Sequence, residues 1–158
     1  MINVRASGRW GAAVLPVLAL GLTIFHNTPL AHAGDDPVLT SVTAVFDTTT
    51  NDKDHDTYLD VLVYNNRGTL IAQKRGIGGH WNDHSSNTVA LDLTNTLRKT
   101  QIPAGRVRLD IHPNGNDKWE FNYHLDLTYQ DGSVTEASWD GKVLTQDNPT
   151  TIDSWNGQ

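Results

Sequence analysis

Residues 119–129 read WEFNYHLDLTY and alternate strictly between apolar and polar side chains. One face carries the aromatic and leucine side chains of Trp119, Phe121, Tyr123, Leu125, Leu127 and Tyr129. The intervening residues are all polar. Period-two alternation is typical of a β-strand that turns one face to a core and the other to solvent. We therefore predict a central strand here, with its odd-numbered residues facing inward.

The same alternation recurs on both sides of this stretch. Further strands are predicted over residues 38–46, 57–65, 69–74, 88–93, 107–111 and 133–139. Turn-forming sequences such as Asn65–Gly68 and Asn114–Asp117 separate them, and residues 94–100 favour one short helical turn. The pattern predicts an all-β fold, an antiparallel two-sheet β-sandwich of about seven to eight strands.

The N-terminus has the three parts of a secretory signal. Arg5 and Arg9 precede an apolar run over residues 11–25, and Ala31-His32-Ala33 offers a small-x-small cleavage site. We expect a cleavable signal peptide over 1–33 and a secreted or periplasmic protein. An uncleaved anchor is the alternative, although a membrane-spanning helix needs about twenty residues. We expect no transmembrane segment after cleavage, a β-sandwich domain over 34–147 and a loosely ordered tail over 148–158.

Charge and cysteine content narrow the functional classes. The chain has 12 Lys and Arg against 18 Asp and Glu, and loss of Arg5 and Arg9 would leave a net charge of −8. That balance argues against nucleic acid, and against anionic lipid unless a cation bridges the two. The chain has no cysteine, so its core or a bound metal must hold the fold together.

An acidic loop precedes the second predicted strand. Asp52, Asp54 and Asp56 recur at every second residue, with Asp47 close by. Calcium takes six to eight hard oxygen ligands, so such a loop is a candidate calcium site. A second loop, residues 112–118, would add oxygens if the two loops converge. The predicted metal set is Asp47, Asp52, Asp54, Asp56, Asn116 and Asp117. A solvated acidic loop and a simple Asn-Gly turn are the alternatives.

A glycine-rich loop over residues 76–84 carries a second candidate site. His80 and His84 are four residues apart, but a glycine-rich segment after a strand is a poor zinc-binding helix. We expect the loop to present Trp81 to a ligand, with His80 and Asp83 beside it. The alternative is that Trp81 tucks the loop onto the sandwich.

Catalysis finds little support in the sequence. There is no cysteine and no Gly-x-Ser-x-Gly segment, and the only glutamates are Glu120 and Glu136. We expect a non-enzymatic protein. A small secreted hydrolase with an unrecognised Asp or His site is the alternative.

Two stretches resemble the PLAT (lipoxygenase-homology) β-sandwich, a relative of the C2 domain. They are DKDHDTYLDVLVY over residues 52–64 and DKWEFNYHLDL over 117–127, with WND at 81–83 and TVALDL at 88–93 in a similar order between them. The resemblance covers about residues 40–130. It implies two packed antiparallel sheets, loops that bind calcium through Asp52, Asp54 and Asp56, and binding to lipids or proteins.

Together these features predict an exported, calcium-binding, non-enzymatic module that acts at a lipid, glycan or protein surface. An envelope interaction protein without metal is the alternative among binding proteins. Metal titration separates these two hypotheses.

Overall fold

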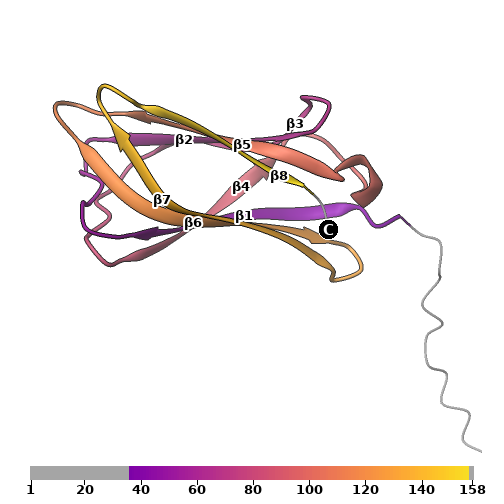
Figure 1. Cartoon of the computed structure of the whole chain (residues 1–158). Helices are drawn as coiled ribbons and strands as arrows, with labels where there is room; N and C mark the ends of the chain where they lie inside the picture. Colours follow the sequence, from indigo (N-terminus) through magenta and orange to yellow (C-terminus); the bar gives the residue numbers. More distant parts are fainter. Residues whose placement is uncertain (1–35, 157–158) are drawn as a thin grey trace, which may run out of the picture. The chain divides into compact units, whose positions relative to one another are not determined.

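The computed structural model describes residues 36–156. They form eight strands and one short 3-10 helix, Lys99–Gln101 (Figure 1). The predicted signal peptide over 1–33 lies outside the described residues. Over residues 36–156, no helix is long and apolar enough to cross a membrane.

The strands pack as two layers, and all pairings are antiparallel (Figure 1). One layer contains β7 (Val134–Thr145), β6 (Lys118–Tyr129), β1 (Leu39–Thr48) and β4 (Ser86–Leu93). The other contains β3 (Leu70–Ile77), β2 (Tyr58–Asn65), β5 (Ala104–His112) and β8 (Thr150–Asn156). Strand β4 pairs along most of its length with β1 and only near Leu93 with β3, so it links the layers. The predicted antiparallel β-sandwich is confirmed.

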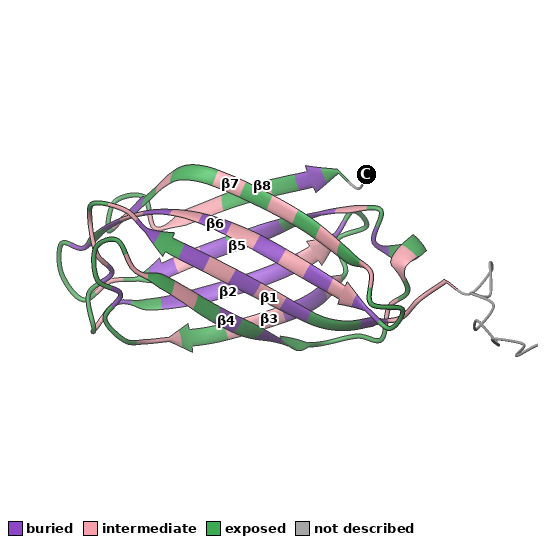
Figure 2. Ribbon diagram, turned by 90° about the horizontal axis from the view of Figure 1, so that it is seen from below, coloured by how far each residue is buried: buried purple, intermediate pink, exposed green. Residues whose placement is uncertain are grey.

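The core lies between the layers and is built as the alternation predicts. Every odd-numbered residue of β6 is buried, and Trp119, Phe121 and Leu125 are 0% exposed. Figure 2 shows the resulting alternation of buried and partly exposed residues along β6. The opposite layer contributes buried aliphatic residues from β2 and β5: Leu59, Val61, Val63, Val107, Leu109 and Ile111. The burial of these odd-numbered residues confirms the predicted inward face of β6. Each buried side chain of this size stabilises the fold by about 1.5–3 kcal/mol.

The C-terminal segment corrects the predicted domain boundary. Residues 148–158 were expected to be a loosely ordered tail, but Thr150–Asn156 form β8, which pairs with β5 along its whole length. The Trp155 side chain is buried over Gly105, where an added Cβ would lie 2.3 Å from the indole. The segment is polar apart from Ile152 and Trp155, so its sequence carries only a weak strand signal. The sandwich domain therefore extends through Asn156.

Candidate functional site

Three loops meet at one end of the sandwich. The backbones of Lys53 and Trp81 form an isolated bridge, with N···O distances of 3.1 and 3.0 Å. The Asn114 amide donates to Asp56 at 3.2 Å, and the Asp54 backbone N–H donates to the Asp117 carboxylate at 3.4 Å. The loops that precede β2, β4 and β6 therefore converge, as the calcium hypothesis requires. We call residues 51–57, 79–84 and 112–118 the loop cluster.

A lysine occupies the interior of the loop cluster. The Lys53 side chain is 0% exposed, and its ammonium donates to the backbone carbonyls of Thr57 at 2.6 Å, Gly79 at 2.7 Å and Asp54 at 3.3 Å. It also lies 5.2 Å from the centre of the Trp81 ring, within cation–π range. Burial lowers the pKa of Lys53, and the neighbouring carboxylate of Asp117 opposes that shift.

The predicted calcium ligands do not form one coordination shell. Asp52 pairs instead with His80, at 2.5 Å between Oδ2 and Nε2. Asp47 and Asn116 are exposed, and Asp56 and Asp117 accept the hydrogen bonds given above. In the part of the chain that the structure describes, no group of three or more His, Cys, Asp or Glu residues is arranged to hold a metal ion. Calcium binding by the six predicted residues stays a prediction.

Trp81 lies in the core rather than on the surface. Its side chain is 7% exposed, and its ring centre lies 5.4 Å from that of Phe46 and 5.3 Å from that of Trp119. The predicted exposure of Trp81 is wrong, because the backbone bridge to Lys53 turns the indole toward the aromatic core. The alternative, that Trp81 tucks the loop onto the sandwich, is correct. His80 and Asp83 are exposed, and a ligand role for them stays a prediction.

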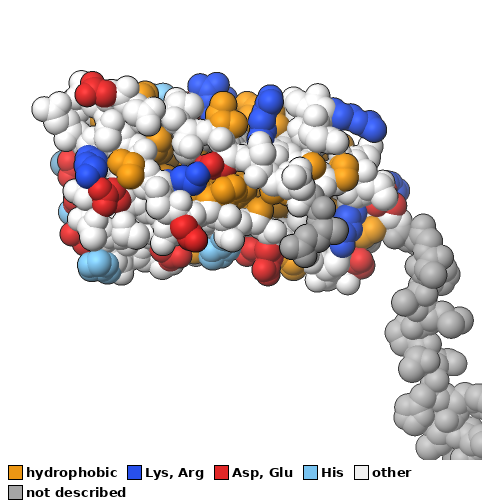
Figure 3. All heavy atoms as spheres, in the orientation of Figure 1, with side chains coloured by type: hydrophobic (Ala, Val, Ile, Leu, Met, Phe, Trp, Pro, Cys, Tyr) orange, Lys and Arg blue, Asp and Glu red, His pale blue; other side chains and the backbone are white. Residues whose placement is uncertain are grey.

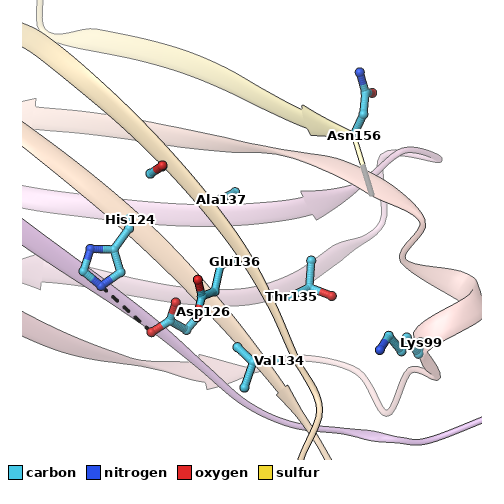
Figure 4. A pocket seen from close by; sticks show the side chains of 9 residues that line it. Lys99, His124, Asp126, Val134, Thr135, Glu136, Ala137 and Asn156 are labelled. Carbon is cyan, nitrogen blue, oxygen red and sulfur yellow. Dashed lines mark ion pairs between the residues drawn. The ribbon is translucent and has the colours of Figure 1, made fainter. Parts of the chain in front are cut away.

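A cleft of about 850 Å³ lies at the edge strand β7 (Figure 4). Its lining includes the five consecutive residues Val134–Ser138, together with Lys99, His124, Asp126 and Asn156. Consecutive strand residues point to opposite faces of a sheet. Contact of one cavity with all five residues therefore favours a position along the edge of β7 over a position on one face. Strand β7 ends the strand order, so this edge has no strand partner among residues 36–156.

Two carboxylates of the cleft lie on β6 and β7. Asp126 and Glu136 lie directly opposite each other on neighbouring strands, an arrangement of like charges that is unfavourable without a cation. His124 Nε2 lies 4.0 Å from the Asp126 carboxylate (Figure 4). Lys99 stands at the far end, where its ammonium donates to Ser133 Oγ at 3.0 Å and lies 5.1 Å from the centre of the Tyr129 ring.

Two buried polar atoms at this end of the sandwich have no hydrogen-bond partner within residues 36–156. They are the Tyr129 hydroxyl and the Trp155 indole N–H. Tyr129 lies under the cleft residue Lys99, and Trp155 immediately precedes the cleft residue Asn156. Burial raises the pKa of Tyr129, so its hydroxyl stays protonated at neutral pH and can donate a hydrogen bond.

Sequence reasoning missed the cleft. Residues 133–139 were recognised as a strand, but an edge strand and a central strand with this pattern look alike. The one available signal is Glu136, a charge in the middle of a strand, which is typical of an exposed edge.

The chain matches no protein-family model and no curated protein. Among solved structures it matches the alpha toxin from Clostridium absonum, at 15% sequence identity and a TM-score of 0.46. The match covers 75% of this chain and 34% of the toxin, so the chain spans about a third of the length of that structure. At this similarity nothing about function follows. The β-sandwich rests on the strand pairings given above, and membership of the PLAT family stays a prediction.

Proposed function

We propose that this chain is an exported, non-enzymatic interaction module that binds an extended peptide segment of a partner protein along the free edge of β7. The observation that carries the proposal is the cleft lined by the consecutive residues Val134–Ser138. A free strand edge offers a row of backbone N–H and C=O groups, and an incoming strand satisfies them by strand addition.

Only the first half of β7 is open to a partner. Beyond Trp139 the register with β6 shifts at a bulge, where Gly141 takes a φ of 62°. Lys142 then forms an ion pair with Asp153 of β8, so the second half of β7 is tied to the facing edge strand. Residues 134–139 are left as a regular strand long enough to pair with about six residues of a peptide.

The charge of this side of the molecule favours a basic peptide. On the face seen in Figure 3, Asp and Glu side chains are more frequent toward the layer of β7, β6, β1 and β4, and Lys or Arg groups lie along the other layer. A peptide strand added to β7 would set one of its side chains beside Glu136, whose cross-strand neighbour is Asp126. A Lys or Arg at that position would relieve the repulsion between the two carboxylates. Glycan and lipid binding, which the sequence leaves open, have no comparable feature in this cleft.

One observation favours the hydrolase alternative. Ser138, His124 and Asp126 line the same cleft, and Ser138 is the cross-strand neighbour of His124. A nucleophilic serine needs a hydrogen bond to its base, and none joins Ser138 to His124. The 4.0 Å separation between His124 and Asp126 also exceeds a hydrogen bond. The cleft therefore favours binding over catalysis.

The test uses two synthetic eight-residue peptides with alternating Val and Thr, one with Lys and one with Glu at the central outward position. We expect the Lys peptide to bind and to slow hydrogen exchange at the amides of residues 134–139. Glu136→Lys should weaken the Lys peptide at least about tenfold, equivalent to about 1.4 kcal/mol, and strengthen the Glu peptide. Asp147→Lys, in the exposed turn after β7, makes the same charge change away from the cleft and is the control.

Protection from hydrogen exchange outside β7 would refute strand addition at this edge. Equal binding of both peptides to both variants would refute the preference for a basic peptide. Labelling of Ser138 by a fluorophosphonate would support the hydrolase alternative instead.

The export part of the proposal is tested separately. Mass spectrometry of the exported protein should find an N-terminus within a residue or two of Gly34, and a chain that begins at Met1 would refute it.

A further inference from the structure

The loop cluster lies away from the β7 cleft and is organised around a side-chain ammonium. The Lys53 side chain extends from the first loop to the second, where its ammonium donates a hydrogen bond to the Gly79 carbonyl. It also donates one to the carbonyl of Thr57, just before β2 begins. An ammonium group has three N–H donors. The carbonyls of Thr57, Gly79 and Asp54 accept all three, so the buried cation is fully hydrogen-bonded.

The charges around Lys53 form the arrangement expected around a bound cation. Carboxylates of Asp54, Asp56 and Asp117 are the charges that act on its ammonium. Asp117 is itself buried, 8% exposed, and belongs to the third loop. The Trp81 ring covers a further side at 5.2 Å. One positive charge thus touches or faces every loop of the cluster.

The Lys53 ammonium occupies the carbonyl oxygens that a metal ion would need as ligands. A calcium ion among these carbonyls would need six to eight oxygens and would lie against the Lys53 ammonium. Two of the nearest oxygens, on Thr57 and Gly79, already accept hydrogen bonds shorter than 2.8 Å from Lys53.

We propose that the Lys53 ammonium is the resident cation of the loop cluster, where it stands in place of a metal ion and holds the three loops together without calcium. Removal of the side chain beyond Cβ would leave a carbonyl-lined, carboxylate-flanked cavity that accepts a small alkylammonium ion. This inference is independent of the interaction function proposed for β7.

The first test uses the wild-type protein. Thermal melts in 5 mM calcium chloride and in chelator should agree within about 1 °C. A functional calcium site at a hundredfold excess of ligand would separate them by several degrees for a domain of this size. The Lys53 ammonium should also give a ¹H–¹⁵N signal with slowed hydrogen exchange, because its donors are buried. A calcium-dependent melt, or a freely exchanging Lys53 ammonium, would overturn the proposal.

The second test removes the cation. Lys53→Met keeps most of the stem but loses the charge, and should lower the melting temperature by about 10 °C or more. Lys118→Met, a change to an exposed lysine at the edge of the same cluster, should lower it by only a few degrees. Equal effects of the two changes would show that Lys53 acts as an ordinary surface lysine.

The third test is chemical rescue. n-Propylammonium chloride has the atoms that Lys53→Ala lacks, and it should raise the melting temperature of that variant by several degrees. Sodium chloride and n-propanol at the same concentration should not, nor should n-propylammonium affect the wild type. Rescue by n-propanol alone would show that the site needs packing rather than a cation. If Lys53→Ala does not fold, the two wild-type measurements still decide the proposal.

Discussion

The Tyr123 hydroxyl on β6 donates a 2.9 Å hydrogen bond to the Asp153 carboxylate on β8. These strands belong to different layers and are not neighbours in the strand order. Lys142 of β7 pairs with the same carboxylate, so β6, β7 and β8 are joined at Asp153. Burial raises the pKa of Tyr123, which keeps the hydroxyl a donor across the physiological range. This polar junction closes the half of the β7–β8 edge that lies away from the cleft.

Tyr123→Phe removes that hydrogen bond and leaves the ring in place. A hydrogen bond to a charged, partly buried group contributes about 1.5–3 kcal/mol, and we expect a loss of that size in a denaturant melt. Tyr58→Phe is the matched control, because the Tyr58 side chain is exposed. A loss no larger than the control's would mean that Lys142 alone satisfies Asp153.

Trp81→Ala should destabilise the domain strongly. The buried indole packs against Phe46 and Trp119, and truncation of a buried aromatic residue costs about 3–5 kcal/mol. Asn82→Ala, the next residue and exposed, should change the free energy of unfolding by less than about 0.5 kcal/mol. A small effect of Trp81→Ala would show that this side chain is exposed, as the sequence predicts.

Gly105→Ala tests whether β8 belongs to the fold. A methyl group at Gly105 would lie 2.3 Å from both the Trp155 ring and the Tyr64 backbone carbonyl, so one of them must move. Overpacking of this kind costs about 1–3 kcal/mol. Ser154→Ala, on the outer face of β8, is the control. If Gly105→Ala proves as stable as wild type, Trp155 does not pack here and the C-terminal segment is loose after all.

The lowered pKa of Glu120 predicts that the protein loses stability in acid. Hydrogen bonds from Lys118, then Thr50 and Asn51, lower the pKa of Glu120 from 4.5 to about 2. Since the folded protein binds this proton more weakly than the unfolded chain does, the contribution is complete above pH 4.5 and disappears as the pH falls toward 2. The stability difference between wild type and Glu120→Gln should therefore be constant above about pH 5 and shrink below it. A difference independent of pH would show that Glu120 has an ordinary pKa in the folded state.

The sequence by itself determined the class of fold and the strands of the core. Alternation of period two depends only on neighbouring residues and on the geometry of one strand, so the buried face from Trp119 to Tyr129 is visible in the sequence. Turn-forming residues mark where the strands end for the same local reason. The convergence of the Asp54 and Asp117 loops was predictable as a possibility, since sandwich loops gather at the ends.

Only the tertiary structure decided which strands are edges, and therefore where the cleft lies. The strand order β7-β6-β1-β4-β3-β2-β5-β8 arises from long-range pairings that no local pattern encodes. The burial of Lys53 is likewise decided only by the tertiary structure. Between two aspartates it looks like a solvated charge, and its burial depends on the Gly79 carbonyl and the Trp81 ring, which are supplied by a loop 26 residues further along the chain. The energy of a buried ammonium is set by the atoms that surround it in space, and these atoms are brought together only when the three loops have met.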